Sequence, residues 1–153
     1  MSASRKYLPI MILLFVSLVA LMSKGIAEVA QTAAVEATIK AQWEKPNHPI
    51  RVPVVVMSGE HAIADWIQEP KGGRALLKLT DGHWHTLMCG DANLAQTNHL
   101  ISAGVPLADA ERLSIALKQA ETKLSQDERA TINSFNGMID MLKAPQHHEQ
   151  HTD

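Results

Sequence analysis

The sequence predicts an α+β fold: an N-terminal helix, a four-stranded antiparallel meander, then C-terminal helices packed on the sheet. Three observations predict it. Residues 28–45 carry apolar side chains at helical spacing, residues 51–89 form short β-type runs between turn signals, and residues 91–142 return to helix-forming composition. A chain of 153 residues, 46% apolar and 20% charged, is typical of one globular domain.

The first predicted helix is amphipathic. Residues 28–45 are rich in Ala with Glu and Lys, and Val35, Ile39 and Trp43 recur at helical spacing. Pro46 is expected to end this helix, because proline lacks the amide donor and restricts the residue before it.

The four predicted strands are separated by turn signals. The strands are expected at residues 51–57, 61–68, 74–80 and 83–89. The turns are expected at Ser58-Gly59, at residues 70–73, which include Gly72 and Gly73, and at Asp81-Gly82. Asp-Gly is a strong hairpin signal, since both residues tolerate positive φ. An antiparallel meander is therefore the expected topology.

The sequence of the C-terminal half, residues 91–142, predicts three helices. Asp91 is expected to cap the first, and Pro106 to lie near the start of the second. Ser125 and Glu128 have the spacing of a capping box, which opens the last helix. The polar residues 146–153 follow as a disordered, His-rich tail. The apolar stripe of the last predicted helix consists of Ile132, Phe135, Met138, Ile139 and Leu142.

Residues 1–27 have the three parts of a secretory signal. A basic start precedes the uncharged, apolar residues 8–22, and Gly25 and Ala27 have the spacing of positions −3 and −1 of a cleavage site. A membrane span needs about 20 apolar residues, and this run is shorter. We expect a signal peptide cleaved after Ala27, with an uncleaved amino-terminal anchor as the alternative. The rest of the chain is exported in either case.

Cleavage would leave a single α+β domain over residues 28–145 with a more acidic charge. It removes Arg5, Lys6 and Lys24 and no acidic residue, so the formal net charge falls from −2 to −5. A nucleic-acid partner is disfavoured, because such binding requires clustered Lys and Arg. The single cysteine, Cys89, cannot form an internal disulfide, so the core depends on packing.

The densest group of possible metal ligands is His83, His85 and Cys89. Alternation along a strand would put these three side chains on one face and Trp84 on the other. Imidazole and thiolate suit copper or zinc. The alternative interpretation is structural: Trp84 and Cys89 belong to a core, and His83 is a solvated strand end.

The tail contains a second group of possible ligands, His147, His148 and His151. Short His-rich tracts bind metals loosely through a flexible chain. The alternative is a tail that only improves solubility. Met138 and Met141 fit the apolar stripe of the last predicted helix, so they are interpreted as core residues rather than as a copper(I) site.

The common catalytic signatures are absent from the sequence. It contains no G-x-S-x-G, H-E-x-x-H, P-loop or Cys-x-x-Cys motif. Asp65, within an apolar strand, is a candidate general base, but alternation favours a position on the outer side of the sheet, facing water. The sequence therefore favours a protein that is not an enzyme.

Six short motifs occur in order along the chain: W-x-K-P, P-V-V-V, G-x-x-A-I-A-x-W-x-Q, G-G-R-A-L-L, a G-x-W run ending in C-G, and G-V-P-x-A-D-A. In these motifs the chain resembles the copper uptake system-associated proteins, a family of small exported bacterial proteins. The residues concerned are Trp43, Lys45 and Pro46; Pro53 to Val56; Gly59 to Gln68; Gly72 to Leu77; Gly82, Trp84, Cys89 and Gly90; and Gly104 to Ala110.

The resemblance implies a role in copper import in the periplasm, beside a copper-transport membrane protein. Trp84 and Cys89 belong to the motifs, whereas His83, His85 and the tail do not. The leading hypothesis is a non-enzymatic accessory protein that binds copper weakly through the tail, with Cys89, His83 and His85 as lesser candidates. The competing hypotheses are a metal-free interaction module that docks onto a membrane transporter, and an enzyme with an unrecognised pocket.

Overall fold

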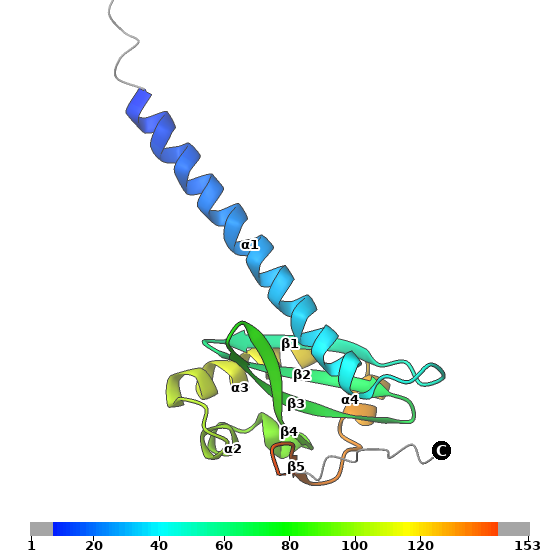
Figure 1. Cartoon of the computed structure of the whole chain (residues 1–153). Helices are drawn as coiled ribbons and strands as arrows, with labels where there is room; N and C mark the ends of the chain where they lie inside the picture. The colour runs from blue at the N-terminus through cyan, green and yellow to red at the C-terminus, as the bar shows by residue number, and fades with distance from the viewer. Residues whose placement is uncertain (1–7, 144–153) are drawn as a thin grey trace, which may run out of the picture. The chain divides into compact units, whose positions relative to one another are not determined.

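The computed structural model describes residues 8–143 (Figure 1). The chain forms two compact units, Met1–Ala34 and Val35–Asp153. Helix α1, Leu8–Trp43, contributes to both units. It begins well before the predicted start at residue 28, because the expected signal segment is also helical. Within residues 8–143, no helix combines the length and the apolar character that a membrane crossing requires.

The second unit is built on a five-stranded antiparallel sheet, which confirms the α+β class. The strands lie in chain order across the sheet (Figure 1). Both residues of the turn at Asp81 and Gly82 have positive φ, 51° and 78°, as the Asp-Gly signal predicts. The strands are β1 Arg51–Ser58, β2 His61–Gln68, β3 Lys71–Thr80, β4 His83–Gly90 and β5 Met138–Asp140.

Strand β5 replaces the second half of the last predicted helix. Helix α4, Gln126–Ile132, begins with the predicted capping box at Ser125 and Glu128. It ends early, because the next five residues are Asn, Ser, Phe, Asn and Gly, which favour turns over helix. Gly137 has φ +84°, and the chain then pairs with β4. The predicted helical stripe through Phe135 and Leu142 is therefore wrong.

Gly72 and Gly73 lie within β3 rather than in a turn, so that prediction is also wrong. They pair with Ile67 and Trp66 of β2. A Cβ at Gly72 would lie 2.8 Å from the carbonyl oxygen of Thr131, and one at Gly73 would lie 2.9 Å from the rings of Phe135 and Trp66. The two glycines therefore allow the chain after α4 to approach the sheet closely.

Four helical segments follow the first four strands, and α4, described above, is the last of them. The predicted helix after Asp91 is divided into a 3₁₀ turn, η1 Ala92–Ala95, and α2 Thr97–Ser102. Asp91 caps η1 as expected, with its carboxylate accepting a 2.8 Å hydrogen bond from the amide of Asn93. Helix α3, Leu107–Glu121, begins directly after Pro106 as predicted.

The C-terminal helices pack on one face of the sheet, which we call the α3 face. Val54, Ile63 and Leu76 point to this face and form a core with side chains of α2 and α3 that include Leu100 and Leu113. Every one of these residues is buried.

The opposite face, the α1 face, packs against the last turns of α1. Val35 and Ile39 are fully buried there against Ala62, Ala64 and Ala75. The small side chains allow the helix to lie close to the strands. Helices thus cover both faces of the sheet.

Candidate functional site

A bulge in β4 separates the three predicted strand ligands. Leu76 pairs with Met88 and Leu77 with Thr86, which leaves Leu87 as an extra residue. A bulge reverses the alternation of side chains beyond it. Cys89 therefore lies on the α1 face, whereas His83 and His85 lie on the other face, so the prediction that all three share a face is wrong.

The local environments of these residues also differ. His83 and His85 are exposed, and His83 Nδ1 lies 2.9 Å from the carbonyl oxygen of Asp81. Cys89 is a free thiol, 5% exposed, and burial raises its pKa to about 12. Within residues 8–143, no group of three or more His, Cys, Asp or Glu side chains could hold a metal ion. His147, His148 and His151 lie outside the described residues.

Cys89 instead lines an apolar pocket of about 290 Å³ on the α1 face. Three of the eight lining residues are aromatic, and the rings of Trp66 and Phe135 meet edge to face, with centroids 5.8 Å apart. The pocket also contains a second sulfur, the thioether of Met141. Its lining consists of Trp43, Ile50, Trp66, Gln68, Cys89, Phe135, Ile139 and Met141.

The pocket has few polar groups. The side-chain nitrogen of Gln68 donates hydrogen bonds to the carbonyl oxygens of Trp43, at 3.2 Å, and of His48, at 2.8 Å. These bonds hold the end of α1 against β2. The indole N–H of Trp66 is buried and has no partner among the described residues. A buried donor without a partner is costly, so this group favours a ligand or water at the pocket.

Residues of several sequence motifs meet at this pocket. Trp43, Trp66, Gln68 and Cys89 come from three of the six motifs, and Gly73, from a fourth, lies directly against Trp66. The apolar pattern of the sequence does not predict the wall formed by Phe135, Ile139 and Met141, because it assigns these residues to a helix. The Asn-Gly pair at residues 136–137 is the turn signal that could have placed this segment correctly.

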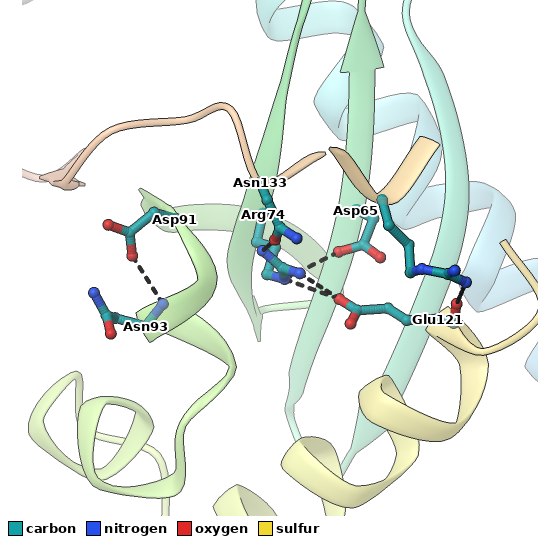
Figure 2. A network of polar contacts seen from close by, with 7 residues as sticks. Asp65, Arg74, Asp91, Asn93, Glu121 and Asn133 are labelled. Atoms are coloured by element: carbon teal, nitrogen blue, oxygen red, sulfur yellow. Dashed lines mark hydrogen bonds and ion pairs between the residues drawn. The ribbon is translucent and has the colours of Figure 1, made fainter. Parts of the chain in front are cut away.

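A buried polar cluster lies on the α3 face (Figure 2). Asp65 is fully buried, so the prediction that it faces water is wrong. Arg74, opposite it on β3, is 4% exposed, and its Nε lies 3.5 Å from Asp65 Oδ1. Arg74 donates to Glu121 Oε1 from Nε at 2.9 Å and from Nη2 at 2.6 Å, and to Asn133 Oδ1 from Nη1 at 3.0 Å.

The cluster holds two carboxyl groups and one guanidinium. Within residues 8–143, neither side-chain oxygen of Asp65 has a hydrogen-bond partner. Burial, followed by the charge of Glu121, raises the pKa of Asp65 to about 7, although Arg74 acts in the opposite direction. Asp65 is therefore neutral in weakly acidic solution, and it titrates near neutral pH.

Comparison with protein-family models, with curated proteins and with solved structures gave no match to this chain.

Proposed function

We propose that this protein is a non-enzymatic accessory protein for copper handling in the periplasm, and that the pocket on the α1 face binds copper(I). The family resemblance supports the link to copper uptake. Residues that carry this resemblance, Trp43, Trp66, Gln68 and Cys89, line the pocket.

The observation that carries the proposal is that two sulfur ligands share one apolar pocket. Cys89 and Met141 both line it, and thiolate and thioether groups select copper(I) over harder ions. The neighbouring indole rings of Trp43 and Trp66 supply electron-rich faces that attract a cation. Met141, interpreted from the sequence as a core residue, thus becomes a candidate ligand.

Copper binding at Cys89 would displace the thiol proton. Burial raises the pKa of Cys89 to about 12, so the thiol is protonated at neutral pH in the absence of metal. A metal that binds the thiolate competes with this proton, and its affinity therefore increases with pH. The histidines of the tail, His147, His148 and His151, remain proposed as a second, looser site.

A metal-free interaction module is the second candidate function. It is favoured by apolar side chains that are exposed beside the pocket: Met138, Ile139 and Leu142 are 42%, 47% and 75% exposed. Such a group is typical of a contact surface. A copper-transport membrane protein would be the partner in this case as well.

Copper titration of three proteins tests the proposal. Copper(I) is titrated against a competing chelator, with wild-type protein, a Cys89→Ser variant and a variant truncated after Pro145. We expect one copper(I) ion bound per wild-type chain, loss of this binding in Cys89→Ser, and retention after truncation. Binding no tighter than that of a polyhistidine-tagged control protein would refute the metal site. Loss on truncation alone would move the site to the tail.

A further inference from the structure

One short segment of chain forms a wall of the pocket. We call residues 133–141 the flap, because Phe135, Ile139 and Met141 within it line the pocket. At its carboxyl-terminal end the flap is held by β-pairing to β4, and by a 2.9 Å hydrogen bond from the amide of Met141 to the carbonyl oxygen of Leu87. In its middle, the amide of Asp91, just after β4, donates a 3.0 Å hydrogen bond to the carbonyl oxygen of Gly137, and the amide of Gly137 donates a 3.2 Å hydrogen bond to Asp91 Oδ2.

The amino-terminal end of the flap is tied to the buried cluster. Asn133 accepts a 3.0 Å hydrogen bond from Nη1 of Arg74, the arginine that also contacts Asp65 and Glu121 (Figure 2). Asp65 and Arg74 lie on the α3 face. The next residue of β2, Trp66, and the preceding residue of β3, Gly73, lie on the opposite face, where Trp66 lines the pocket. A movement of the Arg74 side chain would therefore shift Asn133, and with it Phe135, which lines the pocket two residues further along.

The charges around Asp65 are unbalanced when both acids are ionised. In the described part of the chain, Arg74 is then the one cation that pairs with both Asp65 and Glu121. Strand β1 presents the uncharged Val54 opposite Asp65. On α4, Arg129 donates to the backbone carbonyl oxygens of Glu121 and Leu124 rather than to either carboxylate.

The other charged side chains of α3 and α4 are directed elsewhere. Glu128 is paired with Arg51, Asp109 is paired with Arg112, and Glu111, Lys118 and Asp127 are exposed. While Asp65 is protonated, Arg74 is balanced by Glu121 alone. When Asp65 loses its proton, its buried carboxylate and the partly buried carboxylate of Glu121 compete for one guanidinium.

We propose that the flap is a proton-controlled cover of the pocket: ionisation of Asp65 draws Arg74 away from Asn133 and frees the amino-terminal end of the flap. Ligand entry then becomes easier as the pH rises. The identity of the ligand rests on the proposed function above, whereas the movement of the flap does not depend on it.

The direction of the pH effect follows from the pKa of Asp65. Its pKa of about 7 in the folded protein is above the ordinary aspartate value of 3.8, so the folded state binds a proton that the unfolded state releases. The stabilisation is fully present below about pH 4, and it is lost as the pH rises through about 7. The closed flap is therefore favoured near pH 5.5, and the released flap near pH 8.

Hydrogen exchange of the metal-free protein tests the proposal. Amide exchange is measured from pH 5.5 to 8.5 and corrected for the intrinsic chemical rate. In wild-type protein we expect the opening equilibrium of the flap amides to increase about tenfold, with a midpoint near pH 7, while amides in β2 and β3 show no such step. The Asp65→Asn variant should keep the flap protected at every pH.

Two further variants keep the test decisive. Asn133→Ala removes the side chain that accepts the hydrogen bond from Arg74, so the flap amides of this variant should exchange rapidly at both ends of the pH range. Glu121→Gln leaves Asp65 as the one carboxylate beside Arg74 among the described residues, which lowers the pKa of Asp65 and moves the step to lower pH. A step that persists in Asp65→Asn, or that is missing in wild-type protein, would overturn the proposal. No copper is present, so this outcome is independent of the copper titration.

Discussion

The two faces of the sheet are filled in different ways. On the α3 face, regular helices supply long aliphatic side chains, and Ile63, Leu76, Leu113 and Leu117 are all fully buried. On the α1 face, small residues dominate the centre, and a pocket of about 290 Å³ remains between the end of α1 and the flap. One face is a closed core, and the other is partly open.

The difference shows where this fold can bind a ligand. A helix presents side chains at regular intervals and closes the space above a sheet, whereas the flap is an irregular segment with one short strand, Met138–Asp140. Aromatic rings can line such a space without filling it. Stabilisation that is missing from the open face can be supplied by a ligand instead.

Shortening one side chain on each face should give the largest difference in stability between the two faces. Leu76→Ala removes a fully buried side chain from the α3 face, and we expect a loss of about 2–5 kcal/mol in the free energy of unfolding. Ile139→Ala, at a position that lines the pocket and is 47% exposed, should cost less than about 1 kcal/mol. Urea denaturation monitored by circular dichroism measures both. Equal losses would mean that the two faces are equally well packed.

Adding a methyl group where the flap approaches the sheet most closely is the second test. In Gly73→Ala the new Cβ would lie 2.9 Å from the rings of Phe135 and Trp66, so one of them must move. We expect a destabilisation of about 1–3 kcal/mol, with a change in tryptophan fluorescence from the displaced ring. Ser134→Ala, an exposed change in the same flap, is the matched control and should have little effect. Wild-type stability and fluorescence in Gly73→Ala would contradict the close approach.

The features that the sequence predicted correctly are those with local causes. Asp81-Gly82 specifies a turn through its own backbone preferences, and Ser125 with Glu128 closes its capping box within four residues. Each depends on side chains within a few positions of the backbone that they shape. The four long strands were found for the same reason, because turn signals mark their ends.

The candidate site could not be predicted in this way, because its causes are distant in sequence. The extra residue Leu87 in β4 is defined by its pairing with β3, and it decides which face carries Cys89. The burial of Asp65 depends on Arg74 and on Glu121, 56 positions further along the chain. The alternation of apolar and polar residues along a single strand indicates neither the bulge in β4 nor the burial of Asp65.

The two methionines of the flap region provide the finest test of the open face. Met141 lines the pocket, whereas Met138, in the same segment, is 42% exposed and does not line it. Leu has nearly the same volume as Met, so each Met→Leu change should alter the free energy of unfolding by less than about 1.5 kcal/mol. Met141→Leu also removes a soft sulfur ligand, and Met138→Leu keeps the pocket intact. Competition titration with copper(I) should therefore show weakened binding in Met141→Leu and wild-type binding in Met138→Leu. Equal affinity in the two variants would remove Met141 from the site and leave Cys89 as its sole sulfur ligand among the pocket residues.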